Sequence, residues 1–315
     1  MTDYQWPHPV IDHETFLQNN EVKNILLYLK IEAFFSELFD LDVLLMPSGR
    51  SSISLLLQYF GTNRSKTIFT PKWTSHCVWD MITRLANPTI DCQHGCDTII
   101  AVHKWGQIEK LSSKYSANII EDSVDSIFTK NSTYFPNDGE FEIISLPKII
   151  GSYTGGLILV KNKKNVENVR SYINQNIELG KHQSKLRFNY TQHTSTGYLN
   201  WEDRENQNTS LDTNALENIA ACLNNYHVNK DVITKRLEYV SSKSSLICEY
   251  DRLPPVFCVE VNEINGEIDG RIMIRNKNFS GLLDKPDFRR VALIPLHFQA
   301  NDEFFEFCVR SLCKN

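Results

Sequence analysis

The stretch Ser145-Leu-Pro-Lys-Ile-Ile-Gly-Ser-Tyr-Thr-Gly-Gly156 is a polar, glycine-bearing break between two apolar runs, 141–145 and 157–160. It holds a single lysine, Lys148, with a serine hydroxyl on one side and three glycines on the other. Glycines let a backbone pass close to a bound molecule, and a lysine amine can bond covalently to an aldehyde. Such a stretch on its own is more often a solvated turn, so its meaning depends on the rest of the chain.

The overall composition is that of an ordinary folded protein. The chain has 315 residues, 41% of them hydrophobic, and a net charge of −5. This length favours about two domains, and the dispersed basic residues argue against nucleic acid as a partner. The chain begins with polar residues and has no apolar run of membrane-spanning length. We therefore expect a cytoplasmic protein that does not bind membranes.

The eight cysteines are scattered without a C-x-x-C pair. Cys92, His94 and Cys96 lie close enough together to suggest a metal site, but no second group of ligands follows at finger-like spacing. We therefore expect no bound metal, and cysteines that stay reduced in the cytoplasm.

In the first half of the chain, strand-like and helix-like segments alternate. The apolar spacing predicts helices over 21–38, 53–60, 76–85 and 107–115, and strands over 43–46, 66–70, 89–91, 98–102 and 118–122. Polar residues follow most of these strands. The order predicts a mainly parallel α/β sheet with its sites at the carboxyl ends of the strands.

The second half has a different pattern. A helix is expected over 166–174, and the long polar stretch 175–208 suggests loops or a lid. Further on we expect helices over 211–226, 232–245 and 302–312, and strands over 256–261 and 291–295. We place a boundary near Asn208, with a large α/β domain over 1–208 and a small C-terminal α+β domain over 209–315.

Three features of the first half together suit one cofactor. The turn after strand 43–46 contains Gly49, Arg50 and Ser51 and offers helix-start N–H groups to a phosphate. Asp122, at the end of a strand, can keep a pyridine nitrogen protonated. Lys148 can form a Schiff base with an aldehyde. Pyridoxal 5′-phosphate (PLP) needs this combination, although each feature alone is commonly structural.

Six short motifs lie along the chain: Ser48-Gly-Arg, Pro71-x-x-Thr74, His103-x-x-Gly106-Gln, Ile120-Glu-Asp122-Ser, Ser145-x-x-Lys148 with Gly155-Gly156, and Ile294-Pro-Leu-His297. With them the sequence resembles the DegT/StrS-type sugar aminotransferases, which are PLP-dependent enzymes of the aspartate-aminotransferase fold (fold type I). It looks closest to a truncated subgroup of that family. The resemblance covers most of 45–160 and the end of the chain.

The resemblance implies a three-layer fold around a mainly parallel, mixed sheet, and a role for each motif residue. Lys148 would carry PLP and shuttle protons, Asp122 would pair with the ring nitrogen, and Ser145 with the Gly49–Ser51 amides would hold the phosphate. It also implies a homodimer with active sites at the subunit interface. The reaction would move an amino group from glutamate to a nucleotide-linked keto-sugar for surface polysaccharide.

Two positions depart from the family pattern. Where family members have an aromatic residue stacked on the cofactor ring, this chain has Ser75, and the neighbouring His76 could stack instead. Three residues after Asp122 the family generally has Gln or His against the phenolic oxygen of the cofactor. Here that position is Asp125, whose carboxylate would repel a phenolate, so either it points away or the ring chemistry is altered.

These departures, together with a chain shorter than typical members, leave three functions open. The first is amino transfer to a sugar, and the second is another PLP reaction such as elimination or decarboxylation. The third is a catalytically lapsed relative that serves as a binding or partner protein. The residues that complete the site across subunits cannot be picked out from motifs. Arg187, Asn189 and Tyr190 are candidates by composition only.

Overall fold

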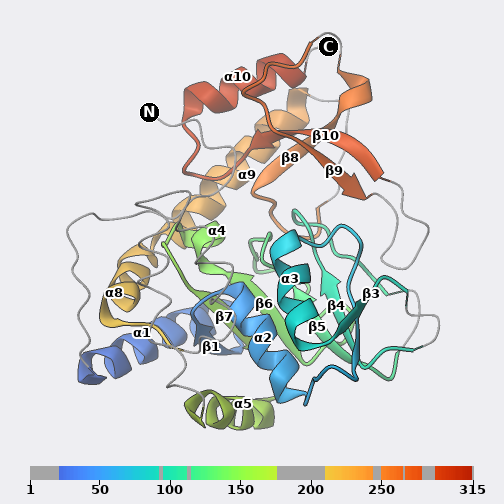
Figure 1. Ribbon diagram of the computed structural model, residues 1–315. Coiled ribbons are helices and arrows are strands. Elements are labelled where there is room, and N and C mark those ends of the chain that lie inside the picture. Colours follow the sequence, from blue (N-terminus) through green and yellow to red (C-terminus); the bar gives the residue numbers. More distant parts are fainter. Residues whose placement is uncertain are drawn as a thin grey trace.

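The computed structural model describes residues 21–91, 95–111, 115–175, 210–243, 250–264, 267–278 and 288–313. These residues form a seven-stranded sheet with helices on both faces, and a separate three-stranded sheet with its own helix (Figure 1). None of the described helices is long and apolar enough to cross a membrane.

The central sheet is mixed but mainly parallel. Its strands in chain order are β1 (Asp42–Met46), β2 (Thr67–Phe69), β3 (Asn87–Thr89), β4 (Thr98–Val102), β5 (Asn118–Asp122), β6 (Phe141–Ser145) and β7 (Gly156–Val160). In space they run β1-β7-β6-β5-β4-β2-β3. Strand β7 is antiparallel to both of its neighbours, and every other adjacent pair is parallel. This confirms the expected fold class.

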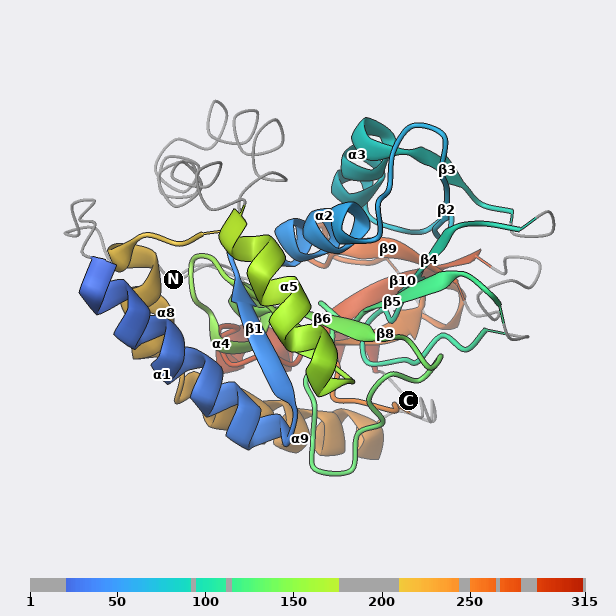
Figure 2. The same cartoon turned by 90° about the horizontal axis from the view of Figure 1, so that it is seen from below.

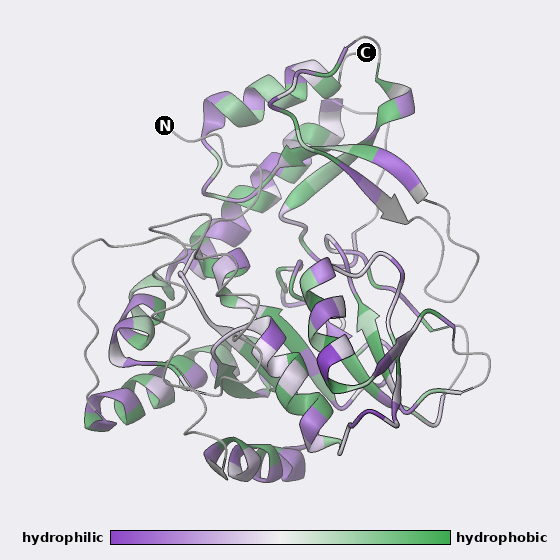
Figure 3. Cartoon of the chain, viewed as in Figure 1, coloured by the Kyte–Doolittle hydropathy of each residue, from purple (hydrophilic) through white to green (hydrophobic). Residues whose placement is uncertain are grey.

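Alternating side chains of the sheet pack on two helical layers, and Figure 3 shows apolar residues gathered along these strands. Val43 and Leu45 face the cluster that contains α1 (Glu21–Phe39), α4 (Leu146–Ile150), α8 (Thr213–Cys222) and α9 (Asn225–Lys243). Leu44 and Met46 face α2 (Gly49–Tyr59), α3 (His76–Leu85) and α5 (Lys163–Gln175). Figure 2 shows α1 and α8 side by side, away from α2 and α5. The period of two in a strand thus produces three layers.

The same alternation decides which polar residues meet at the end of the sheet. Ile120 and Ile143 pack in the cluster beneath α2. Asp122 and Ser145 lie two residues further along the same strands, so they share that face. Glu121 lies between Ile120 and Asp122 and is therefore directed to the opposite face.

The C-terminal part is an antiparallel sheet covered by one helix. It consists of β8 (Val256–Glu260), η3 (Val261–Glu263), β9 (Ile274–Asn278), β10 (Phe288–Pro295) and α10 (Asp302–Leu312). Strand β10 lies in the middle, between β8 and β9, and α10 packs on it. The boundary expected near Asn208 lies outside the described residues and stays a prediction.

The predicted helix over 107–115 is wrong for the described part, because Gln107–Leu111 are not helical. Three of their backbone N–H groups are bound by side chains instead of by carbonyls four residues earlier. Ile108 donates to Asp251 Oδ2, Glu109 to His103 Nδ1 and Leu111 to Asn137 Oδ1. Two of these acceptors come from distant parts of the chain, so the local pattern could not reveal them.

Two further differences concern the site. Helix α2 begins at Gly49, four residues before the predicted start, because Ser48 caps it. Lys148 lies in the short helix α4 rather than in a turn. Pro147 is compatible with the first turn of a helix, and Gly151 ends α4 in the left-handed conformation with φ 72°. Most other predicted elements are confirmed to within a few residues at their ends, as far as they are described. The helix expected over 211–226 ends earlier, as α8 at Cys222, because the chain turns at 223–224. The helix expected over 232–245 begins seven residues earlier, as α9 at Asn225, and β9 was not predicted.

Candidate active site

Three segments meet at the edge of the central sheet where β1, β5 and β6 end. Gly156, at the start of β7, pairs with Met46 on one side and Ser145 on the other. A Cβ on Gly156 would lie 2.4 Å from the carbonyl carbon of Ser48. The Pro47 carbonyl accepts hydrogen bonds from the backbone N–H of Gly155 and the hydroxyl of Thr154, both at 2.7 Å. The start of α2 therefore rests directly on the glycines that follow Lys148.

Gly49 shows how closely the three segments approach. A Cβ at this position would lie 2.9 Å from Cγ1 of Val124 and 4.0 Å from Cβ of Ser145. Val124 is two residues after Asp122, and Ser145 is three residues before Lys148. The first turn of α2 thus lies between the acidic and the lysine-bearing segments, and only glycine fits there without displacing them.

The first turn of α2 has the features of an anion-binding site. The Ser48 hydroxyl accepts the Ser51 N–H at 3.0 Å, and the Ser52 hydroxyl donates to the Ser48 carbonyl at 2.9 Å. No acidic residue lies in this turn. The remaining N–H groups of a first helical turn have no acceptor within their own helix and lie at its positive end. Arg50 is buried in the same turn.

Asp122 is a buried carboxyl group with a raised pKa. Only 2% of the residue is exposed, and its pKa is raised from 3.8 to about 6, chiefly by this burial. The negative charge of Asp125 contributes to the rise. Lys148 and the N–H of Val124, which donates to Asp122 Oδ1 at 3.3 Å, act in the opposite direction. A buried carboxylate of this kind is poorly satisfied by the protein alone, so a cationic N–H donor would stabilise it.

Lys148 and Asp125 form an ion pair. The Lys148 side chain is 26% exposed and that of Asp125 is 11% exposed. In the structure the carboxylate of Asp125 faces the amine of Lys148, so this position supplies a counter-ion for the lysine. How Asp125 lies toward a bound cofactor ring stays a prediction.

The remaining predicted residues are placed differently. Ser145 is half-buried at the end of β6, and its hydroxyl does not cap the following helix. His76 is the first residue of α3 and is exposed. Within the described ranges it makes no hydrogen bond or ion pair with the other predicted site residues. Stacking of His76 on a cofactor therefore stays a prediction.

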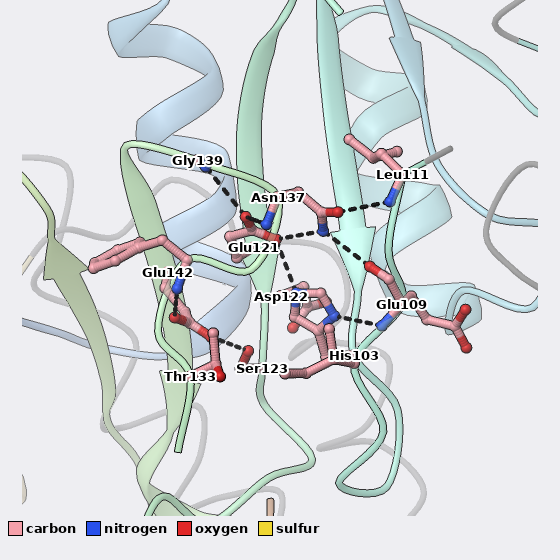
Figure 4. Close-up of polar contacts among 12 residues, drawn as sticks. His103, Glu109, Leu111, Glu121, Asp122, Ser123, Thr133, Asn137, Gly139 and Glu142 are labelled. Atoms are coloured by element: carbon pink, nitrogen blue, oxygen red, sulfur yellow. Dashed lines mark hydrogen bonds and ion pairs between the residues drawn. The ribbon is translucent and has the colours of Figure 1, made fainter. Parts of the chain in front are cut away.

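Figure 4 shows a buried network on the opposite face, which the motifs indicated only in part. His103 lies 2.8 Å from Glu121, and its Nδ1 accepts the N–H of Glu109 at 3.1 Å. The second contact places the proton on Nε2, facing Glu121. Burial would raise the pKa of Glu121, but hydrogen bonds from His103 and Asn137 hold it below its ordinary value. Glu121 is therefore satisfied within the protein, unlike its neighbour Asp122.

A second buried carboxylate, Glu142, was not anticipated. It pairs in register with Glu121 on the adjacent strand and lies 2.7 Å from Arg252, both side chains being fully buried. Arg252 also donates to the Thr133 carbonyl at 2.6 Å and stacks on Phe128. Glu142 was detectable as the charged residue of an apolar strand, but its partner lies 110 positions later and left no local signal.

No group of three His, Cys, Asp or Glu side chains is arranged to hold a metal ion in the ranges that the structure describes. Cys92 and His94, and the cross-subunit candidates Arg187, Asn189 and Tyr190, lie outside those ranges.

The donor set at the edge of the sheet fits PLP. The first turn of α2, with Ser145, would hold a phosphate. Asp122 would hold a protonated ring nitrogen, which supplies the cation that the buried carboxylate lacks. Lys148 is an amine within reach of the same space. Since Gly49 and Gly156 have no side chains, the backbone can approach a ligand closely there.

The fold is also found in known structures. "Putative sugar aminotransferase Spr1654 from Streptococcus pneumoniae, apo-form" has a TM-score of 0.66 and 13% identity, and the match covers 99% of this chain and 97% of that one. A DegT DnrJ EryC1 StrS aminotransferase from Brucella abortus has a TM-score of 0.61 and 15% identity, with 91% and 89% covered. The aminotransferase TlmJ from Streptoalloteichus hindustanus has a TM-score of 0.58 and 10% identity, with 94% and 91% covered. At these identities the likeness concerns the fold.

No curated protein gives a significant sequence match. A family model does: the family described as "Putative PLP-dependent aminotransferase" matches residues 31–315, which include every site residue discussed above. The chain therefore belongs to this family of PLP-dependent aminotransferases.

Proposed function

We propose that this protein transfers an amino group from glutamate to a nucleotide-linked keto-sugar, in the cytoplasm, for the synthesis of surface polysaccharide. The observation that carries the proposal is the packing at Gly49, where the first turn of α2 meets the segment that follows Asp122 and the strand end that precedes Lys148. Two kinds of support point to the sugar. The motifs resemble sugar aminotransferases, and Spr1654, which shares the fold, is titled a sugar aminotransferase.

The chain's own residues account for the steps of such a transfer. When bound, PLP supplies an aldehyde that captures amines and a protonated ring that draws electrons from the carbon next to the captured nitrogen. Asp122 would keep the proton on the ring nitrogen. Lys148 would bind the cofactor, and once free it would take the proton from the donor's carbon and deliver it to the carbon on the other side of the nitrogen. Ser145 and the α2 amides would hold the phosphate and so fix the orientation.

The direct test uses glutamate and a panel of nucleotide-linked keto-sugars. With the PLP-loaded protein we expect 2-oxoglutarate and an aminated nucleotide-sugar of matching amount, both identified by mass spectrometry. Formation of 2-oxoglutarate without an aminated sugar would contradict the sugar substrate but keep amino transfer. A product that has lost carbon dioxide or a leaving group would identify another PLP reaction.

Replacing Asp125 tests its effect on Lys148. The ion pair holds the Lys148 amine against the Asp125 carboxylate, and it must break before the amine can attack an aldehyde. We expect Asp125→Asn to speed the covalent capture of PLP at pH 7 by about 5- to 10-fold, because an ion pair of this kind is worth about 1 kcal/mol. The rate is followed by borohydride trapping at timed intervals. Asp138→Asn, which breaks the exposed ion pair with Lys161, is the matched control and should change nothing. An unchanged or slower rate in Asp125→Asn would contradict this prediction.

We also propose a homodimer, supported by an apolar stripe on α1. Val22, Ile25, Leu26 and Leu29 follow helical spacing and are 71%, 61%, 63% and 59% exposed. A contiguous exposed stripe of this kind commonly marks a protein interface.

The stripe gives a direct prediction. Leu26→Glu should shift the protein from dimer to monomer in sedimentation velocity, because the interface would have to bury an unpaired charge. Ser171→Glu adds the same charge to an exposed position of α5 and should leave the dimer intact. A wild-type protein that sediments as a monomer at micromolar concentration would disprove the homodimer.

A further inference from the structure

Helix α4, which carries Lys148, cannot hold its position by itself. It has five residues, and isolated helices of such length are unstable in water. Four of the five residues are buried, and Lys148 is the exception. The last carbonyls of a helix have no partner within it, so in a helix this short they must be satisfied from elsewhere.

Two asparagines of α9 satisfy the last two carbonyls of α4. Asn229 Nδ2 donates to the Ile149 carbonyl at 2.9 Å, and Asn225 Nδ2 donates to the Ile150 carbonyl at 3.0 Å. The two asparagines are four positions apart, so they lie on one face of α9. Helices α4 and α9 pack against each other (Figure 1).

Asn229 is fixed in one orientation by its second contact. It is fully buried, and its Oδ1 accepts the N–H of Phe298, just beyond β10, at 3.0 Å. One side of the amide meets a carbonyl and the other an N–H, so the group cannot flip without losing both bonds. Aspartate has the same size but no donor, and would place an oxygen against the Ile149 carbonyl.

We propose that Asn225 and Asn229 are positioning residues for Lys148, holding α4 so that the lysine amine reaches the cofactor aldehyde. This rests on the proposed function, in which Lys148 binds PLP. Asn229 holds the carbonyl of Ile149, the residue next to Lys148, so a shift of that carbonyl moves the base of the lysine side chain. A misplacement of about 1 Å can slow a reaction by about 100-fold.

The experiment separates placement of the lysine from binding of the cofactor. Covalent capture of PLP at Lys148 is measured by timed borohydride reduction and peptide mass mapping of the apoprotein. Affinity for pyridoxamine 5′-phosphate, which needs no bond to Lys148, is measured by calorimetry. The first variant is Asn229→Asp. Because a buried carboxylate could prevent folding, the second variant is Asn225→Ala, at a position that is only half-buried.

Arg236→Met provides a control on the same helix. Arg236 donates to the carbonyls of His297 and Ala300 at 2.7 and 2.8 Å and pairs with Asp302, but has no bond to α4. Its loss should lower the melting temperature without affecting the lysine. We expect both asparagine variants to capture PLP about 10- to 100-fold more slowly, while pyridoxamine 5′-phosphate affinity stays within about 3-fold.

Each result either supports or contradicts the positioning role of the two asparagines. Unchanged capture rates in the asparagine variants, with label on Lys148 in the wild type, would overturn the positioning role alone. The positioning role would also be overturned if the asparagine variants lost PLP capture and pyridoxamine 5′-phosphate affinity equally. An equal slowing of capture in Arg236→Met would overturn it too, because both results would indicate a general loosening of the fold. If the wild type takes no label on Lys148, the proposed function itself is wrong and the positioning role falls with it.

Discussion

Lys148→Ala is expected to abolish covalent attachment of PLP and to reduce amino transfer by at least about 10⁴-fold. Two functions are lost at once, the covalent anchor and the proton carrier, and residues that act as a unit give losses of this order. The fold should survive, because Lys148 is the partly exposed residue of α4 and its four neighbours fill the core. The measurement is borohydride reduction after incubation with PLP, followed by peptide mass mapping.

A phosphopyridoxyl label on the peptide containing Lys148 in the wild type, absent from the variant, would confirm the assignment. Lys163→Ala, at an exposed position at the start of α5, is the matched control and should be labelled at Lys148 like the wild type. Visible absorbance retained by Lys148→Ala, or a label spread over surface lysines, would remove Lys148 from the site.

Asp122→Asn is expected to have opposite effects on activity and on stability. Without the carboxylate the ring nitrogen loses the group that keeps it protonated, and we expect amino transfer to fall by about 100- to 1,000-fold, as when a preorganised electrostatic partner is removed. The apoprotein, however, should become more stable at neutral pH, by about 1–3 kcal/mol, because it no longer buries a poorly satisfied charge.

The direction of the pKa shift determines how the stability difference changes with pH. The pKa of Asp122 is raised from 3.8 to about 6 on folding, so the folded state binds the proton more tightly than the unfolded state. The stability from this group is fully present below pH 3.8 and is lost as the pH rises through about 6. The difference between variant and wild type should therefore be small at pH 4, grow up to about pH 6 and stay constant above it.

Urea unfolding of both apoproteins from pH 4 to pH 8 measures this difference directly. Asp80→Asn, which removes a partly exposed carboxylate paired with Arg84 on α3, controls for the loss of one charge near the surface. An Asp122→Asn apoprotein less stable than the wild type at pH 7 would mean that the buried carboxylate is already satisfied. The case for a cationic ligand at that position would then fail.

The comparison with the other buried carboxylates explains why Asp122 stands out. Glu121 has His103, Asn137 and backbone donors, and Glu142 has Arg252 and the N–H of Phe135. Among these three acids of β5 and β6, Asp122 has the weakest set of hydrogen-bond partners, a single long contact with a backbone N–H. A site that holds a cationic ligand needs such an incompletely satisfied acid, because a fully paired carboxylate would have nothing left to offer.

The sequence by itself determined the sheet and the residues at its edge. Strands such as 98–102 and 118–122 are set by local apolar runs, and they place Asp122 at a strand end. The small residues from Ser48 to Ser52 indicated that a helix follows β1, since capping depends on neighbours along the chain, although the helix starts four residues before the predicted position. The motif residues around Lys148 could also be recognised, because each lies within a few positions of the next.

Only the tertiary structure decided what these residues face. The ion pair of Asp125 with Lys148 joins residues 23 positions apart, and Arg252 reaches Glu142 from a later part of the chain. The segment from Gln107 onwards is not helical in part because Asp251 accepts the N–H of Ile108. Local propensity cannot report such partners, because hydrogen bonds and charges act through space and their strength depends on burial. The pKa of Asp122 has the same origin: an aspartate at a strand end is visible in the sequence, but its burial exists only in the folded chain.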